Sequence, residues 1–209
     1  MTTEPFLNSL ARTPIIAVIR ARTAEDYAPI IDALVAGGVR TIEVTLTTPG
    51  TLQILGRLRD RVGGAATVGV GTIRTTSDAQ RAIEEGAEFL VSPHVDPEIV
   101  RLAVTASVPV FPGAFTPTEV SAALRAGATA VKIFPASQTS PSMAGQLRGP
   151  FPELEFLPSG GIGLDDVRPW LLAGASAVCV GSPLIGAPGT EPDEITARAK
   201  AYIAAARQT

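Results

Sequence analysis

The sequence predicts an α/β protein in which eight parallel strands alternate with helices and close into a (β/α)8 barrel, also called a TIM barrel. Four segments repeat one design, in which an alanine-rich helical stretch ends in glycine and an apolar strand follows almost at once. Eight apolar segments of strand length are present, and a helical stretch follows each of them. Strands that alternate with helices run parallel, and eight such units close most readily into a barrel.

The four repeated segments predict the joints between helices and strands. They are ALVAGGVRTIEVTL at 33–46, AIEEGAEFLVSP at 82–93, ALRAGATAVKIFP at 123–135 and LLAGASAVCVGSP at 171–183. A helix often ends on a residue in the left-handed conformation, which glycine adopts at little cost. We therefore expect positive φ angles just past the four helices, at Gly37 or Gly38, Gly86, Gly127 and Gly174.

The eight strands are predicted near residues 15–20, 41–46, 66–72, 89–93, 108–114, 130–135, 154–159 and 177–182. A short helix at about 4–12 precedes them and is expected to close the bottom of the barrel, and residues 193–207 form the last outer helix. No linker divides residues 1–209, so we expect one domain. An open doubly wound sheet is the alternative, but no GxGxxG motif follows the first strand, and GVGTI at 69–73 is a poor match to it.

Composition excludes several classes of function. The 17 basic and 20 acidic residues are scattered, so no basic stripe favours nucleic acid as a partner. One cysteine, Cys179, makes neither an internal disulfide nor a CxxC pair, and one histidine, His94, does not supply a multi-histidine zinc site. The apolar runs are too short for a membrane helix and the start of the chain lacks a secretory signal, so we expect a cytoplasmic protein.

Lys132 is the clearest candidate for chemistry. The chain has 15 arginines but only two lysines, and Lys132 lies inside the apolar strand AVKIFP, whereas Lys200 lies on the last helix. Because side chains alternate along a strand, Lys132 and Phe134 are expected to face the barrel interior, opposite to Val131. Burial disfavours the ammonium form of a lysine, and the free amine is the form that attacks a ketone. A buried ion pair or a lysine that extends to the barrel mouth is the alternative.

Glu43 and Arg20 complete the candidate charged group. In TIEVTLT the apolar Ile42 and Val44 alternate with polar residues, so Glu43 is expected to point inward. A carboxyl group beside an inward lysine acts as its counter-ion or as a general base. Arg20 ends the first strand, where its planar guanidinium suits a carboxylate substrate, or forms a salt bridge with Glu43.

Glycine-rich segments after the last two strands predict a phosphate site. Ser159, Gly160 and Gly161 follow the seventh strand, and Gly181 and Ser182 follow the eighth. In barrels of this kind these two loops are the recurrent phosphate site, because glycines let backbone N–H groups converge on the oxygens. A phosphorylated small molecule is therefore the expected ligand.

Three further residues follow the strands at the same end of the barrel. Thr72 ends the third strand and Pro93 ends the fourth, so both are expected to line the mouth. His94 comes next, and we expect a loop or interface role for it, since no acidic residue is patterned to orient it.

The motifs, in this order, resemble those of the 2-keto-3-deoxy-6-phosphogluconate (KDPG) and 4-hydroxy-2-oxoglutarate (KHG) aldolase family. The resemblance runs from about residue 14 to 207, and the pair E-V-T and K-I-F-P-A is its most specific part. The motifs are IEVTLTTPG around Glu43, GVGTI around Thr72, FLVSPH, FPGAFTPTE, AVKIFPA around Lys132, LPSGGI and CVGSPL.

The resemblance implies a class I pyruvate aldolase that needs no metal or other cofactor. It also implies a homotrimer of (β/α)8 subunits, acting in Entner-Doudoroff breakdown of sugar acids, with a phosphorylated 2-keto-3-deoxy sugar acid as substrate and pyruvate as product. By position in the motifs, Lys132 corresponds to the Schiff-base lysine and Glu43 to the general acid/base. The substrate-binding residues are Arg20 and Thr72 for the pyruvate carboxylate, Thr47, Pro93 and Phe134 along the pocket, and Ser159, Gly160, Gly161, Gly181 and Ser182 for the phosphate.

The chain departs from some family members at two positions. Thr47 stands where some members carry arginine, which Arg20 could replace, and Ser159 stands where some carry threonine. The enzymes for 2-keto-3-deoxy-6-phosphogalactonate and for 4-hydroxy-2-oxoglutarate share the lysine and glutamate, so these substrates are alternatives. A phosphosugar isomerase and a non-catalytic binder of phosphorylated sugar acids are alternatives of other classes.

Overall fold

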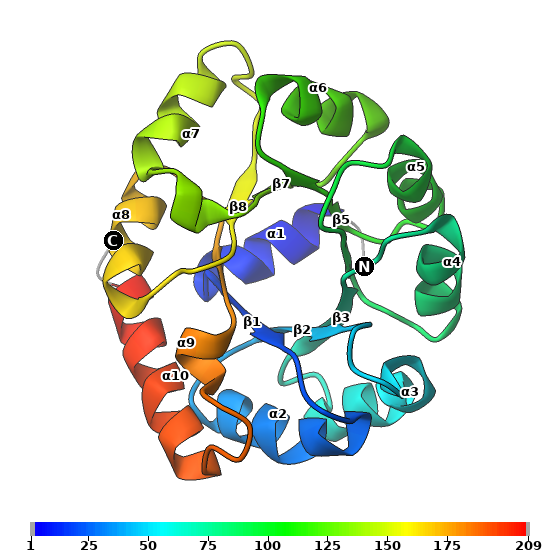
Figure 1. Cartoon of the computed structure of the whole chain (residues 1–209), viewed down its shortest axis with the longest axis vertical. Helices are drawn as coiled ribbons and strands as arrows, with labels where there is room; N and C mark the ends of the chain where they lie inside the picture. The colour runs from blue at the N-terminus through cyan, green and yellow to red at the C-terminus, as the bar shows by residue number, and fades with distance from the viewer. Residues whose placement is uncertain (1–2, 208–209) are drawn as a thin grey trace.

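The computed structural model describes residues 3–207, with side chains from Phe6 to Arg207, and its helices surround a ring of short parallel strands (Figure 1). The strands are β1 (Ile15–Ile19), β2 (Thr41–Thr45), β3 (Thr67–Gly71), β4 (Leu90–Val91), β5 (Val110–Phe111), β6 (Gly113–Ala114), β7 (Val131–Ile133), β8 (Phe156–Pro158) and β9 (Val178–Val180). The helices are α1 (Thr3–Arg12), α2 (Tyr27–Ala36), α3 (Thr51–Val62), α4 (Thr76–Glu84), α5 (Pro97–Thr105), α6 (Pro117–Ala126), α7 (Pro141–Arg148), α8 (Val167–Leu172), α9 (Ser182–Ile185) and α10 (Pro192–Ala206). Short 3-10 helices are η1 (Ala24–Asp26), η2 (Ala136–Gln138) and η3 (Leu164–Asp166).

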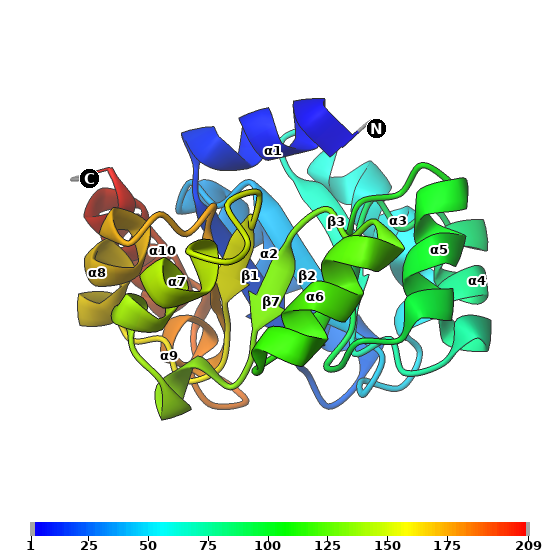
Figure 2. The same cartoon turned by 90° about the horizontal axis from the view of Figure 1, so that it is seen from above.

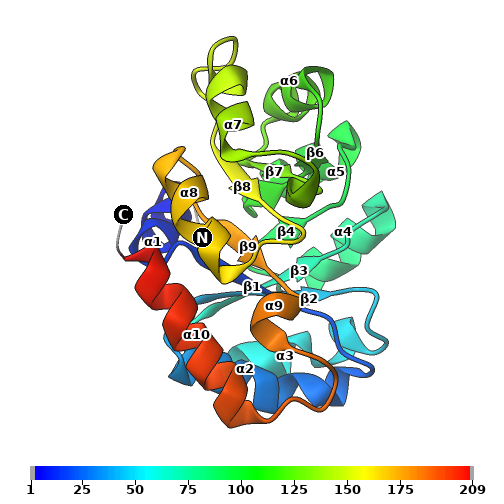
Figure 3. The same cartoon turned by 60° about the vertical axis from the view of Figure 1, so that its left-hand side comes forward.

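The predicted α/β class with parallel strands is confirmed, but the hydrogen-bonded sheet is not one closed barrel of eight strands. In the described residues the strands form a six-stranded sheet, β5-β4-β3-β2-β1-β9, and a three-stranded sheet, β6-β7-β8. The predicted strand at 108–114 is divided by Pro112 into β5 and β6, because proline has no N–H to donate to a ladder. At the other seam, β8 and β9 lie side by side (Figure 3), and Ser159 next to β8 forms an isolated parallel bridge with Cys179 of β9.

Helix α1 occupies the range where a short N-terminal helix was expected, and it covers one end of the ring of strands (Figure 2). Its Phe6 and Leu10 are buried against apolar side chains that point into the ring. The rings of Phe6, Phe89 and Phe111 pack with centroids 5.4–5.7 Å apart. This end of the interior is therefore filled by hydrocarbon.

The predicted joints between helices and strands are confirmed at all four glycines. Gly38, and not Gly37, takes the left-handed conformation after α2, and the φ angles of Gly38, Gly86, Gly127 and Gly174 are 99°, 85°, 94° and 90°. A reciprocal polar cap begins α6: the Thr116 hydroxyl accepts from the Glu119 amide, and the Glu119 carboxylate accepts from the Thr116 amide. The glycines therefore set where the four helices stop, and the cap sets where α6 begins.

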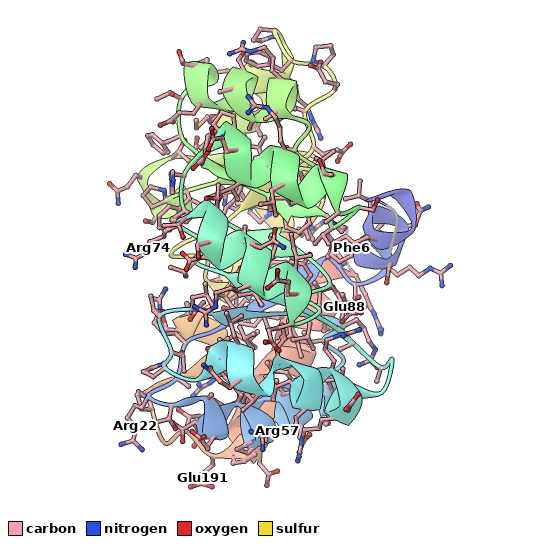
Figure 4. The ribbon with its side chains drawn as sticks, turned by 90° about the vertical axis from the view of Figure 1, so that its right-hand side faces the viewer. Phe6, Arg22, Arg57, Arg74, Glu88 and Glu191 are labelled. Atoms are coloured by element: carbon pink, nitrogen blue, oxygen red, sulfur yellow. The ribbon has the colours of Figure 1, made fainter. Side chains whose placement is uncertain are left out.

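The loops after the strands lie at the end opposite α1. In Figure 4, Arg22 after β1 and Arg74 after β3 lie at one side of the molecule, while Phe6 of α1 lies at the other. Glu88, which precedes β4, lies toward α1. Among the described residues no helix has the length and apolar character required to cross a membrane.

Candidate active site

A cavity of about 250 Å³ opens at the carboxyl ends of the strands. It brings together nearly all of the residues that the sequence singled out, from both sheets. Its lining comprises Val18, Arg20, Glu43, Thr72, Pro93, Lys132, Phe134, Ser159, Gly160, Gly161, Cys179, Gly181, Ser182 and Pro183. Thr47 lies beside this cavity in contact with Arg20, and His94 is not part of the lining.

Lys132 lies in the middle of β7 with its side chain in the cavity. Val131 and Ile133 on either side belong to the outer apolar core, as the alternation predicts. Lys132 is 8% exposed, and its Nζ lies 5.1 Å from the centroid of the Phe134 ring. Among the described residues no ion pair involves Lys132, so its amine faces the cavity rather than a fixed carboxylate.

Glu43 lies in the middle of β2 and is 1% exposed. Its Oε2 is the only buried side-chain oxygen or nitrogen in the described residues that lacks a hydrogen-bond partner. Burial raises the pKa of the Glu43 carboxyl, an effect that the positive charges of Lys132 and Arg20 partly oppose. A carboxyl group with a raised pKa and a free oxygen at a cavity is suited to exchange protons with a ligand.

Gly71, at the end of β3, makes room for this carboxyl group. The Glu43 side chain leans along the strand toward the mouth, and a Cβ built at Gly71 would lie 1.7 Å from Glu43 Oε1. Any larger residue at this position would displace the carboxyl group. The absence of a side chain at Gly71 is thus a condition for the position of Glu43.

Arg20 follows β1 and reaches the cavity from an exposed position. Its Nε donates a hydrogen bond to Thr47 Oγ1 at 3.0 Å. No ion pair with Glu43 is found among the described residues, which leaves the rest of the guanidinium for an anionic ligand.

Thr72 and Pro93 line the same mouth, as expected. Thr72 has φ 62°, a left-handed conformation that β-branched residues rarely adopt. Strain of this kind persists where the surrounding structure enforces it, and it is frequent at ligand sites. The next residue is anchored, because the Ile73 amide donates to the Val91 carbonyl at 3.1 Å.

The loop of Ser159, Gly160 and Gly161 forms one wall of the cavity. Gly160 and Gly161 have φ angles of 91° and 78°, which a residue with a Cβ would adopt only with strain. The η2 turn holds this loop, since the Ala136 and Ser137 amides donate to the Ser159 and Gly160 carbonyls at 2.7 and 2.9 Å. Backbone of this kind can approach a bound anion closely.

Cys179, Val18 and Pro183 also line the cavity, although the sequence analysis did not single them out for it. Burial raises the pKa of the Cys179 thiol to about 12, so the thiol stays neutral at physiological pH. The alternation that places Lys132 inward could have identified Cys179 as well, because Cys179 lies two residues before Gly181 in an apolar strand.

The fold and the cavity place a lysine amine and a carboxyl group at the carboxyl ends of parallel strands, an arrangement typical of α/β enzymes. The family model described as "Aldolase: KDPG and KHG aldolase" matches residues 7–198. The chain belongs to this aldolase family.

Relatives with known names and structures agree with this assignment. A protein of Rhizobium meliloti named as a probable 2-dehydro-3-deoxy-6-phosphogalactonate aldolase is 33% identical over 193 residues, covering 92% of this chain and 91% of the relative. The 2-keto-3-deoxy-6-phosphogluconate aldolase of Zymomonas mobilis with 3-phosphoglycerate is 30% identical, with a TM-score of 0.85 and coverage of 95% of each chain. The KDPG aldolase of Legionella pneumophila, with pyruvate captured as a covalent carbinolamine, is 29% identical, with a TM-score of 0.83 and coverage of 93% of this chain and 96% of that one.

Proposed function

We propose that this protein is a class I aldolase that cleaves 2-keto-3-deoxy-6-phosphogluconate to pyruvate and glyceraldehyde 3-phosphate. One observation carries the proposal: the Lys132 amine and the unpartnered Glu43 carboxyl group share a cavity of about 250 Å³ with a glycine-rich loop. The Legionella pneumophila relative, with its covalent carbinolamine of pyruvate, supports an amine as the nucleophile.

The reaction begins when the neutral amine of Lys132 adds to the C2 ketone of the substrate and forms a carbinolamine. Glu43 donates a proton to the departing hydroxyl, water leaves, and the C2 carbon becomes an iminium linked to Lys132. Because burial raises the pKa of Glu43, the carboxyl group can hold the proton that this step consumes.

Carbon-carbon cleavage follows from the positive charge of the iminium. Glu43 accepts the proton of the C4 hydroxyl, directly or through a water, and the electron pair of the C3–C4 bond moves toward the iminium nitrogen. Glyceraldehyde 3-phosphate leaves, and the enamine of pyruvate remains on Lys132. Protonation at C3 and addition of water then release pyruvate and restore the amine.

The other cavity residues bind the two ends of the substrate. Arg20 and Thr72 hold the pyruvate carboxylate, with Thr47 supporting Arg20. Pro93 and Phe134 wall the pocket, and Ser159, Gly160, Gly161, Gly181 and Ser182 hold the phosphate. The Zymomonas mobilis relative, which carries 3-phosphoglycerate, supports a site for a phosphorylated ligand.

Reduction with borohydride in the presence of pyruvate tests the chemistry. An iminium on Lys132 is trapped as a stable adduct of known mass, and peptide mapping locates it. Lys132→Arg should abolish both the adduct and turnover, because a guanidinium does not deprotonate at working pH. Lys200→Arg, on the exposed face of α10, is the matched control and should change neither. A Lys132→Arg protein with near-native turnover would refute the assignment.

A coupled lactate dehydrogenase assay for released pyruvate identifies the substrate. We expect turnover of the phosphogluconate-derived acid to exceed that of 2-keto-3-deoxy-6-phosphogalactonate and of 4-hydroxy-2-oxoglutarate. A phosphosugar isomerase or a non-catalytic binder would release no pyruvate from any of the three. Turnover should be unchanged by a chelator, because neither the amine nor the carboxyl group needs a metal.

Our proposal also includes the assembly and the setting of the enzyme. The two sheets act as one (β/α)8 barrel and one domain over residues 1–209, supported by the single residue, Pro112, that separates β5 from β6 and by the bridge between Ser159 and Cys179. Family resemblance supports a homotrimer working in the cytoplasm in Entner-Doudoroff breakdown of sugar acids. Light scattering after gel filtration tests the trimer, and cell fractionation tests the location.

A further inference from the structure

Two threonines in the turn after β2 hold the end of β1, where Arg20 lies. Thr47 Oγ1 accepts the hydrogen bond from Arg20 Nε at 3.0 Å. The Thr48 hydroxyl accepts from the Ala21 amide at 3.0 Å and donates to the Ala21 carbonyl at 3.2 Å. Thr48 is 1% exposed and lies outside the cavity lining, so its hydroxyl serves the backbone beside Arg20 and not the ligand directly.

This turn is itself fixed from the side of α2 and α3. The Thr51 hydroxyl lies 2.8 Å from the Thr48 carbonyl and 3.0 Å from the Thr45 carbonyl. The buried Tyr27 of α2 donates to the same Thr45 carbonyl at 3.2 Å, and its hydroxyl lies 3.0 Å from Thr51 Oγ1. The Thr48 amide closes the turn on the Thr45 carbonyl at 3.1 Å. Because the turn that carries Thr48 is held in place, the Thr48 hydroxyl holds the Ala21 backbone in a fixed position.

The neighbouring backbone adds a second connection between the same two loops. The Ala24 amide donates to the Pro49 carbonyl at 3.1 Å. Gly50, with φ 84°, lies so close to Ala24 that a Cβ at Gly50 would be 3.2 Å from the Ala24 side chain. The loop after β1 is thus held along its length, while the Arg20 side chain remains exposed and makes no ion pair in the described part of the chain.

A fixed arginine binds a carboxylate at lower cost than a free one. An arginine side chain carries about 2 kcal/mol of rotamer entropy, and holding it in place before the ligand arrives removes part of that cost from binding. The hydrogen bond to Thr47 orients the guanidinium, and the two hydrogen bonds of the Thr48 hydroxyl hold the amide and the carbonyl of Ala21, the residue after Arg20.

We propose that Thr48 is a positioning residue that sets Arg20 for the carboxylate of the keto acid. This inference rests on the proposed function, because it takes Arg20 as the partner of that carboxylate. Thr48 touches neither the ligand nor the reacting atoms, and its effect passes through Ala21 to Arg20.

Thr48→Val tests the role, because valine keeps the shape of threonine and leaves the Ala21 amide and carbonyl without their partner. We expect the KM for the substrate to rise about tenfold, the size of effect that the loss of one or two hydrogen bonds gives, with kcat within about threefold of wild type. Thr48→Ser, which keeps the hydroxyl, should restore the wild-type KM.

Thr129→Val is the matched control. The Thr129 hydroxyl also accepts from a backbone amide, that of Val110 at 3.1 Å, but it lies before β7 at the end away from the cavity. The Thr129→Val variant should have a lower melting temperature, as Thr48→Val should, but an unchanged KM. Equal KM changes in the two valine variants would assign Thr48 a purely structural role and overturn the inference.

A double-mutant cycle with Arg20→Ala separates action through Arg20 from any other route. In the Arg20→Ala background Thr48→Val should raise the KM no further, because the group that it positions is gone. An undiminished effect in that background would overturn the inference. If Thr48→Val does not fold, Thr48→Ala, which also removes the hydroxyl, provides the same cycle and should raise the KM only when Arg20 is present.

The borohydride adduct distinguishes failure of this inference from failure of the proposed function. A wild-type protein that traps no pyruvate on Lys132 contradicts the aldolase proposal itself. A wild-type protein that traps pyruvate, together with a Thr48→Val variant of unchanged KM, contradicts the positioning role alone. Trapping in both proteins, with a higher pyruvate concentration for half-maximal trapping in Thr48→Val, supports both.

Discussion

Gly71→Ala should disable the candidate site by moving one carboxyl group. The new methyl group would lie 1.7 Å from Glu43 Oε1 and 2.4 Å from its Cδ, whereas real contacts of a Cβ essentially never fall below 3.0 Å. The carboxyl group must therefore move by more than 1 Å. The carboxyl group has room to move, because Glu43 lines the open cavity. The φ angle of Gly71 is not positive, so an alanine at this position has no backbone strain.

The size of the effect follows from that displacement. A shift of about 1 Å in a catalytic group can cost roughly a hundredfold in rate, and a positioned acid/base contributes about 10² to 10⁴-fold. We expect kcat for pyruvate release to fall about a hundredfold, with a smaller change in KM. Because the carboxyl group can move into the cavity, the loss of stability should be below the usual 1–3 kcal/mol of an overpacked core.

Gly69→Ala is the matched control on the same strand and the same face. Its methyl group would lie 2.4 Å from the Phe89 ring, which is enclosed in the apolar interior and has no cavity to enter. This variant should lose about 1–3 kcal/mol of stability, or roughly 2 to 12 °C in Tm, and keep most of its kcat. The reasoning is wrong if Gly71→Ala retains kcat within about threefold of wild type, or if both variants lose activity to the same extent.

Two further predictions concern the buried titratable groups. Burial raises the pKa of the Glu43 carboxyl above its ordinary value of 4.5, so the folded protein binds this proton more tightly than the unfolded chain does. The free energy of unfolding should therefore fall as the pH rises from 4.5 through the raised pKa. Urea unfolding across this range should show the slope in wild type and a weaker slope in Glu43→Gln; identical slopes would contradict it. Burial raises the pKa of the Cys179 thiol from an ordinary 9.0 to about 12, which lowers the share of the reactive thiolate. Iodoacetamide should therefore modify the native thiol about a thousandfold more slowly than the urea-unfolded thiol. Equal rates in the two states would contradict this prediction.

The inward positions of Lys132 and Glu43 could be predicted because successive side chains of a strand point to opposite faces. Lys132 between Val131 and Ile133, and Glu43 between Ile42 and Val44, each place one polar side chain on the face opposite two apolar ones. The structure puts both in the same cavity. This signal depends only on local geometry, so one sequence is enough to read it.

Features that depend on contacts between distant segments could not be predicted in the same way. The sequence TLTTPG contains the hydroxyls of Thr47 and Thr48, but their partners at Arg20 and Ala21 lie 27 residues away in the chain. The division of the sheet had a local signal, since Pro112 lies inside the predicted strand at 108–114 and lacks the N–H that a ladder needs. The left-handed conformation of Thr72 had none, because threonine disfavours it.

The division of the sheet bears directly on Glu43 and Lys132, the pair that we propose to be catalytic. Glu43 lies on the six-stranded sheet and Lys132 on the three-stranded sheet, so the geometry of the pair depends on how the two sheets meet. The bridge between Ser159 and Cys179 joins the two sheets at the cavity, and the packing of Phe6 against Phe89 and Phe111 fills the opposite end of the interior. Apolar side chains fill that end, whereas Glu43 and Lys132 line the cavity at the carboxyl ends of the strands. There Lys132 and Glu43 both face the cavity, where the proposed reaction needs an amine and a carboxyl group within reach of one ligand.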